Sequence, residues 1–98
     1  MGSKYSVKIT KSALNDLELV YLYILETSFS KEIATKIKEE IVKEIFSLEL
    51  FPKKNIKIDG FRNIRRLLVY SYALLYRIEE EKREVTILRI LSNYTDWH

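Results

Sequence analysis

The fold is decided by the stretch Ile64-Arg65-Arg66-Leu67-Leu68-Val69-Tyr70-Ser71-Tyr72-Ala73-Leu74-Leu75-Tyr76-Arg77-Ile78. Most of its residues are leucine, aromatic or β-branched, a composition typical of buried strands. The break at Ser71 predicts two strands joined by a tight hairpin turn. Another apolar run, 85–91, follows the charged turn 79–83 and predicts a third strand.

Two amphipathic helices are predicted upstream of this hairpin. Apolar residues recur at three- and four-residue spacing over about 12–27, with Ser12 as the candidate N-cap. A second apolar stripe covers 33–48, and Ser28 or Ser30 is its candidate cap. Because the connection between the helices is short, they should form an antiparallel hairpin.

The chain begins with a predicted strand, because apolar and polar residues alternate over 4–10. The element order is therefore β-α-α-β-β-β. It predicts an α+β fold with an N-terminal strand, an antiparallel helix hairpin and a three-stranded antiparallel sheet. A length of 98 residues suits one domain spanning 1–98.

The central sheet lacks the polar alternation that a half-solvated antiparallel sheet requires, because nearly every residue from Leu67 to Ile78 is apolar. Both faces therefore need cover, and the helices supply it for one. The other face is expected to meet a protein partner, since a seven-residue tail buries too little area. Cover by the tail alone is the alternative.

Composition limits the chemistry of any site. The 17 Lys and Arg against 14 Asp and Glu give a net charge of +3, which permits an acidic protein or a nucleic acid as partner. Cysteine is absent and the one histidine is His98. A thiolate metal site and an internal histidine base are thus excluded within one chain, and we expect no metal or cofactor. A cytoplasmic location is expected, with no membrane-spanning stretch.

Basic residues concentrate in the second half of the chain. The polar loop 52–63 and the start of the next strand contain Lys53, Lys54, Lys57, Arg62 and Arg65.

Two further arginines, Arg66 and Arg89, lie inside apolar strands, where an unpaired charge is costly. Arg89 alternates with Val85, Ile87 and Leu91, so all four are expected on one face. If the strands of Arg66 and Arg89 are neighbours, the two arginines converge on one groove that suits a phosphate. Ion pairs with nearby glutamates are the structural alternative.

The chain resembles the RelE/ParE toxin superfamily in an ordered set of segments: KITKSALNDL (8–17), SLELFP (47–52), IRRLLV (64–69), YALLYRI (72–78), VTILRIL (85–91) and Asp96-Trp97. The resemblance implies a toxin of a type II toxin–antitoxin system, with a cognate antitoxin covering the exposed sheet face. RelE-like members cleave messenger RNA on the ribosome without a metal, whereas ParE-like members poison DNA gyrase.

Residues of an RNA-cleaving site can be carried over by position. Arg66 and Arg89 would stabilise the phosphorane charge, and Tyr94 would protonate the leaving oxygen. RNA would be bound by Lys53, Lys54, Lys57, Arg62 and Arg65. Many relatives read His-Gly-Arg-Arg after the last strand, where this chain reads Ser-Asn-Tyr-Thr at 92–95.

Three functions follow from these observations. The expected function is ribosome-dependent messenger RNA cleavage, which the lysine loop and the clustered arginines favour, and the other two are alternatives. A ParE-like gyrase inhibitor without catalysis, or an inactive antitoxin-binding relative, is favoured by the modest charge and the missing histidine.

Overall fold

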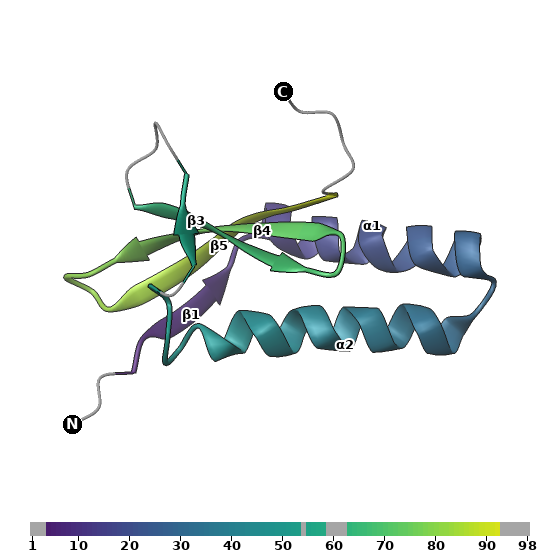
Figure 1. Cartoon of the computed structure of the whole chain (residues 1–98), viewed down its shortest axis with the longest axis horizontal. Coiled ribbons are helices and arrows are strands. Elements are labelled where there is room, and N and C mark those ends of the chain that lie inside the picture. The colour runs from purple at the N-terminus through teal and green to yellow at the C-terminus, as the bar shows by residue number, and fades with distance from the viewer. Residues whose placement is uncertain (1–3, 54, 59–62, 93–98) are drawn as a thin grey trace.

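The computed structural model describes residues 4–53, 55–58 and 63–92, and it confirms the predicted α+β fold (Figure 1). The elements in chain order are β1 (Ser6–Ile9), α1 (Lys11–Ser28), α2 (Lys31–Ser47), β2 (Ile56–Lys57), β3 (Ile64–Val69), β4 (Tyr72–Glu79) and β5 (Glu84–Ser92). The two-residue strand β2 was not predicted, because it lies within the polar loop.

The sheet has the order β1-β5-β4-β3-β2. Strands β3, β4 and β5 pair antiparallel, as predicted, and β2 extends them along the far edge of β3. Strand β1 pairs parallel with β5, with Val7 opposite Val85, so the whole sheet is mixed. A parallel pairing needs a long crossover connection, which begins here with the α1–α2 hairpin.

The helix boundaries correct one predicted cap. Thr10, rather than Ser12, is the N-cap of α1, and its Oγ1 accepts a hydrogen bond from the Ala13 amide at 3.1 Å. The same hydroxyl donates to the carbonyl of Ile87, so the helix starts as soon as β1 leaves the sheet. Ser30 caps α2 as predicted, by accepting from the Ile33 amide.

The helix hairpin covers one face of the sheet, and the core lies between them. Along β4 the buried side chains Leu74, Tyr76 and Ile78 alternate with the more exposed Leu75 and Arg77. Figure 1 shows the two helices running side by side and extending past the sheet to their common turn. Within the described residues, no helix is both long and apolar enough to span a membrane.

Candidate functional site

The sheet face opposite the helices, which we call the outer sheet face, is both basic and apolar. Its members named here are Arg66, Leu68, Leu75, Arg77 and Arg89. Leu75 of β4 lies opposite Arg66 of β3 on one side and Arg89 of β5 on the other. The two predicted arginines thus share a face, but β4 separates them. Their backbones are two strand spacings apart, roughly 10 Å.

A β-bulge places Arg89 on this face. The pairing shifts between Leu75 and Tyr76, which lie opposite Arg89 and Ile87, so Leu88 is an extra residue in β5. An extra residue reverses the alternation of side chains beyond it. The prediction that Arg89 shares a face with Val85 and Ile87 is therefore wrong, since both are buried toward the helices whereas Arg89 is exposed.

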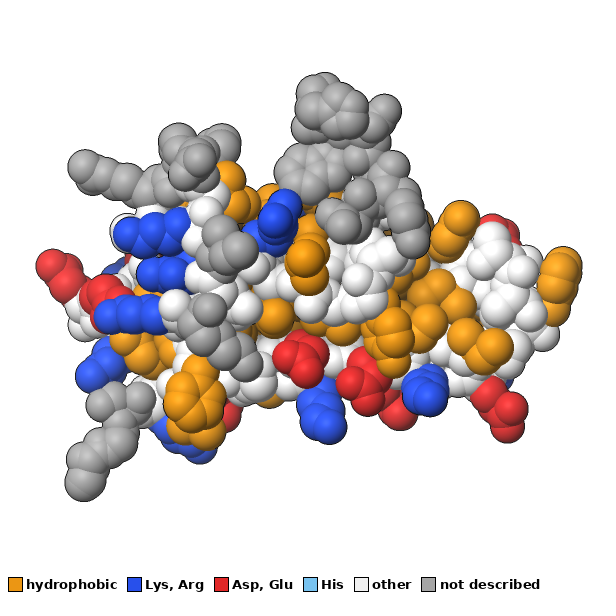
Figure 2. Space-filling view, viewed as in Figure 1, with side chains coloured by type: hydrophobic (Ala, Val, Ile, Leu, Met, Phe, Trp, Pro, Cys, Tyr) orange, Lys and Arg blue, Asp and Glu red, His pale blue; other side chains and the backbone are white. Residues whose placement is uncertain are grey.

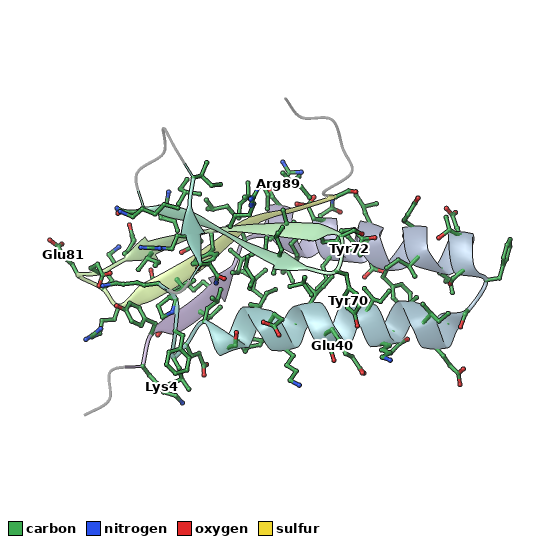
Figure 3. The ribbon with its side chains drawn as sticks, in the orientation of Figure 1. Lys4, Glu40, Tyr70, Tyr72, Glu81 and Arg89 are labelled. Atoms are coloured by element: carbon green, nitrogen blue, oxygen red, sulfur yellow. The ribbon has the colours of Figure 1, made fainter. Side chains whose placement is uncertain are left out.

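The guanidinium of Arg89 is held by Asp16 of α1. Its Nε donates to Asp16 Oδ2 at 2.7 Å and its Nη2 donates to Oδ1 at 3.1 Å, which is a bidentate ion pair. Asp16 Oδ2 also accepts the backbone amide of Ile90 at 2.9 Å. Because β1 pairs with β5 only as far as Ile87, Asp16 satisfies an edge amide that lacks a strand partner. Figure 3 shows Arg89 where β5 meets α1.

Burial and pairing act in opposite directions on Asp16. Burial alone raises the pKa of this carboxyl, but hydrogen bonds from Arg89 and Ile90 and the charge of Arg89 outweigh it, so the pKa lies below its ordinary value. The hydrogen bond and charge of Asp16 in turn raise the pKa of Arg89. Sequence reasoning missed Asp16, although an acid on the buried stripe of Ala13, Leu17 and Val20 was a usable signal.

The predicted basic loop is tied to the body of the molecule. Arg65 Nη1 donates to the carbonyl oxygens of Lys53 at 3.1 Å and Asn55 at 2.7 Å. Lys53 Nζ lies 2.8 Å from Glu80 Oε2, and this hydrogen-bonded pair raises the pKa of Lys53 and lowers that of Glu80. Lys57 is exposed on β2, opposite Arg65. Of these residues, Arg65 stabilises the loop through its two hydrogen bonds to loop carbonyls.

Tyr76 of β4, which sequence reasoning also missed, holds the same loop through its hydroxyl group. Its buried hydroxyl donates to the Pro52 carbonyl at 2.5 Å and accepts from Asn55 Nδ2 at 3.1 Å. Burial raises the pKa of Tyr76, which keeps the hydroxyl protonated as a donor. The loop residues 52–55 are therefore held by β3 and β4 together.

The remaining predicted site residues are less constrained by the structure. Arg66 is half-buried and Arg77 is exposed, and neither forms an ion pair within the described residues. Lys54, Arg62 and Tyr94 lie outside the described residues. In the part of the chain that is described, no three His, Cys, Asp or Glu side chains gather closely enough to hold a metal ion.

Figure 2 shows how the charges lie on one face of the molecule. Lys and Arg side chains gather at the end formed by the strands, whereas hydrophobic side chains are prominent at the end where α1 meets α2. The basic surface and the helix turn are thus at opposite ends of the long axis (Figures 1 and 2).

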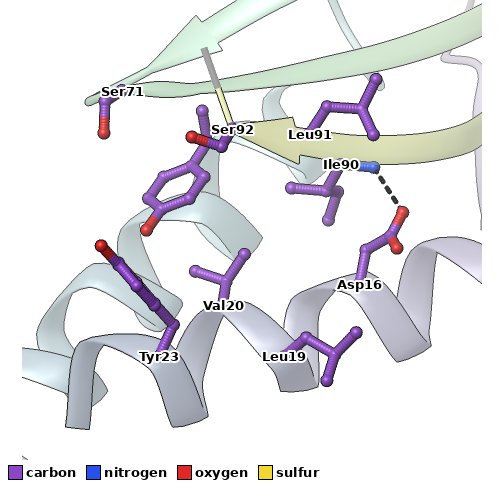
Figure 4. A pocket seen from close by; sticks show the side chains of 9 residues that line it. Asp16, Leu19, Val20, Tyr23, Ser71, Ile90, Leu91 and Ser92 are labelled. Carbon is purple, nitrogen blue, oxygen red and sulfur yellow. Dashed lines mark hydrogen bonds between the residues drawn. The ribbon is translucent and has the colours of Figure 1, made fainter. Parts of the chain in front are cut away.

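A mostly apolar groove of about 470 Å³ lies between α1 and the adjoining ends of β4 and β5 (Figure 4). Its lining residues are Asp16, Leu19, Val20, Tyr23, Ser71, Tyr72, Ile90, Leu91 and Ser92. An apolar groove with a few polar groups is typical of binding sites, and here Asp16 supplies the charged group of the lining.

Comparison with known proteins identifies the family. A family model described as the ParE toxin of the type II toxin–antitoxin system parDE matches residues 7–97. The chain belongs to the ParE toxin family. It is thus a type II toxin–antitoxin toxin of the RelE/ParE superfamily. No curated protein matches this chain.

Solved structures share the fold of this ParE-family chain at low sequence identity. A chain of the chromosomal ParDE system from P. aeruginosa is 23% identical with a TM-score of 0.77, over 91% of this chain and 96% of that one. A chain of the RelBE2 toxin–antitoxin complex from Mycobacterium tuberculosis is 24% identical, with a TM-score of 0.67 and 94% of each chain covered. A mutant E. coli RelE toxin in the free state is 16% identical, with a TM-score of 0.70 and coverages of 96% and 88%.

Proposed function

We propose that this ParE-family toxin arrests growth by binding DNA gyrase and that it does not cleave RNA. The observation that carries the proposal is the Asp16–Arg89 pair. RNA cleavage would require the Arg89 guanidinium to donate hydrogen bonds to a phosphate and so stabilise the negative charge that develops on it. Here Nε and Nη2 of Arg89 are already committed to a buried carboxylate of the fold.

The surroundings of the two arginines support a binding role. General acid–base catalysis needs a titrating group within hydrogen-bond reach of the reacting atoms. In register, Leu75 lies opposite both Arg66 and Arg89, and Leu91 lies two residues along β5 from Arg89. The described carboxylate in contact with Arg89, Asp16, is already paired with it. An alternation of leucine and arginine suits a protein surface, where the guanidinium groups supply specificity and the leucines supply buried area.

The second partner in this proposal is a cognate antitoxin on the outer sheet face. Several structural neighbours are toxin–antitoxin complexes. The exposed Leu68 and Arg77 suit an antitoxin segment that carries apolar and acidic side chains, which would complement this face in both respects. We place this complex in the cytoplasm.

Ribosome-dependent messenger RNA cleavage is the second candidate function. It is favoured by the row in which Arg66 and Arg89 flank Leu75 on one face, with the exposed Lys53 and Lys57 on the loop beyond β3. In this reading Arg66, Arg89 and Tyr94 are catalytic, and the lysines with Lys54, Arg62 and Arg65 bind RNA. Binding should then weaken steeply with salt, because phosphate contacts release counterions.

The two functions separate in growth-arrested cells that express the chain. We expect arrest without new messenger RNA ends at ribosomal A-site codons, and an Arg66→Ala variant should give the same RNA profile. New A-site ends that disappear in Arg66→Ala would establish the cleavage function instead. Absence of arrest would indicate an inactive relative that only binds the antitoxin.

A further inference from the structure

The turn between α1 and α2 carries a phenylalanine that the fold leaves uncovered. Phe29 is 91% exposed, the highest value among the large hydrophobic residues of the described chain, and the next helix adds Ile33 at 47%. Figure 1 shows this turn at one end of the molecule, whose long axis measures 44 Å. Phe29 therefore gains almost no packing from its own chain.

The backbone of Phe29 is also unfavourable. Its φ of 56° and ψ of 28° place it in the left-handed region, where it caps α1 by donating a hydrogen bond from its backbone N–H to the Leu25 carbonyl. Glycine and asparagine occupy this position at the lowest cost, because a bulky side chain crowds the following carbonyl. An aromatic residue here thus adds backbone strain and exposed apolar area at a single position.

We propose that Phe29 is an anchor that inserts into an apolar pocket on the protein that this toxin inhibits. The inference rests on the proposed function, in which that target is a protein. The turn is convex, so only a concave apolar surface can bury the whole ring. Single aromatic anchors of this kind carry much of the binding energy in protein interfaces.

Charge at the turn favours a protein over a nucleic acid or an anionic membrane. Glu26, Lys31 and Glu32 are the exposed charged residues nearest to Phe29 in sequence, and together they carry one negative charge. Nucleic acids and anionic lipids attract clusters of lysine and arginine, which the turn lacks. Lys31 is the single basic residue within two positions of Phe29, whereas Arg66, Arg77 and Arg89 lie on the outer sheet face, away from this turn.

The structure supplies a matched control for the backbone effect. Tyr70, in the β3–β4 turn, has the same φ of 56° but is 58% exposed, so part of its ring contacts its own chain. Replacing either residue by asparagine relieves the same strain. Phe29→Asn should therefore melt above the wild type, whereas in Tyr70→Asn the lost ring contacts offset the relieved strain. Only Phe29→Asn should lose target binding.

The test compares purified wild-type chain, Phe29→Asn, Phe29→Tyr and Tyr70→Asn as inhibitors of DNA gyrase supercoiling, together with growth arrest on expression. We expect Phe29→Asn to require at least about 30-fold more protein for inhibition, as for an interface hot spot. It should also fail to arrest growth, whereas the other two variants retain both activities.

The outcomes distinguish this inference from the proposed function. Gyrase inhibition by Phe29→Asn equal to wild type, or an equal loss in Tyr70→Asn, would overturn the anchor and leave the gyrase proposal standing. If the wild type arrests growth without inhibiting gyrase, the gyrase proposal fails, and arrest alone tests the anchor: unchanged arrest by Phe29→Asn overturns it. A wild type with neither activity overturns both, and a lower melting temperature for Phe29→Asn contradicts the backbone argument.

Discussion

Replacing Asp16 by alanine should be among the most damaging single changes in this chain. The Asp16 side chain is 9% exposed and accepts three hydrogen bonds, two from Arg89 and one from the Ile90 amide. Alanine removes all three acceptors at once. Arg89, at 51% side-chain exposure, can turn to water, but the Ile90 amide at the edge of β5 is buried and has no substitute.

The size of the loss follows from these contacts. A buried amide left without an acceptor costs about 1–3 kcal/mol, and the lost charge-assisted contacts add to it. We therefore expect Asp16→Ala to lower the free energy of unfolding by about 3 kcal/mol. In a domain of this length that is a fall in Tm of roughly 12–24 °C. Asp16→Asn keeps an oxygen for Ile90 and should lose only about 1 kcal/mol.

Urea denaturation of the wild type, Asp16→Ala, Asp16→Asn and Arg89→Leu measures this directly. The order of stability should be wild type, then Asp16→Asn, with Asp16→Ala lowest. Arg89→Leu leaves the buried Asp16 carboxylate without its charged partner, but it should lose less than Asp16→Ala because Asp16 still accepts the Ile90 amide. A loss below about 0.5 kcal/mol in Asp16→Ala, the range of ordinary surface changes, would refute the argument, as would a larger loss in Arg89→Leu.

Three further predictions concern the same contacts. Because pairing lowers the pKa of Asp16, the contribution of Asp16 to the free energy of unfolding is present above the ordinary carboxyl pKa of about 4 and is lost as the pH falls through the lower folded value. Lowering the pH from about 5 to about 2 should therefore reduce the free energy of unfolding of the wild type more than that of Asp16→Asn. Tyr76→Phe leaves the Pro52 carbonyl without its donor, and should cost about 1–2 kcal/mol and speed proteolysis of the loop after Pro52. Glu80→Gln removes the exposed ion pair with Lys53, and calorimetry should show an almost unchanged Tm, since such pairs contribute little.

The order of elements could be predicted because periodicity reports burial directly. The apolar stripe on α2 and the break at Ser71 each reflect one local preference, and the structure confirms both. The cap of α1 could not be placed as reliably. Thr10 and Ser12 are both good caps, and the choice depends on where β1 leaves β5, a contact across 77 residues.

The geometry of the candidate site depended on features that the sequence shows only weakly. The bulge at Leu88 reverses the side on which Arg89 lies, and nothing in an apolar run marks which residue is extra. In the sheet order, β4 lies between the strands of Arg66 and Arg89, so the two arginines are not on neighbouring strands. Asp16 was the detectable exception, since a carboxylate on a buried helix stripe needs a partner.

We propose that this toxin acts on DNA gyrase as a protein inhibitor. The most direct measurement incubates the purified chain with gyrase, ATP and supercoiled plasmid, and quantifies linear plasmid after protein digestion. We predict that linear plasmid accumulates in proportion to toxin and only when gyrase is present. Unchanged gyrase activity, with cleavage of ribosome-bound messenger RNA by the same preparation, would contradict the claim.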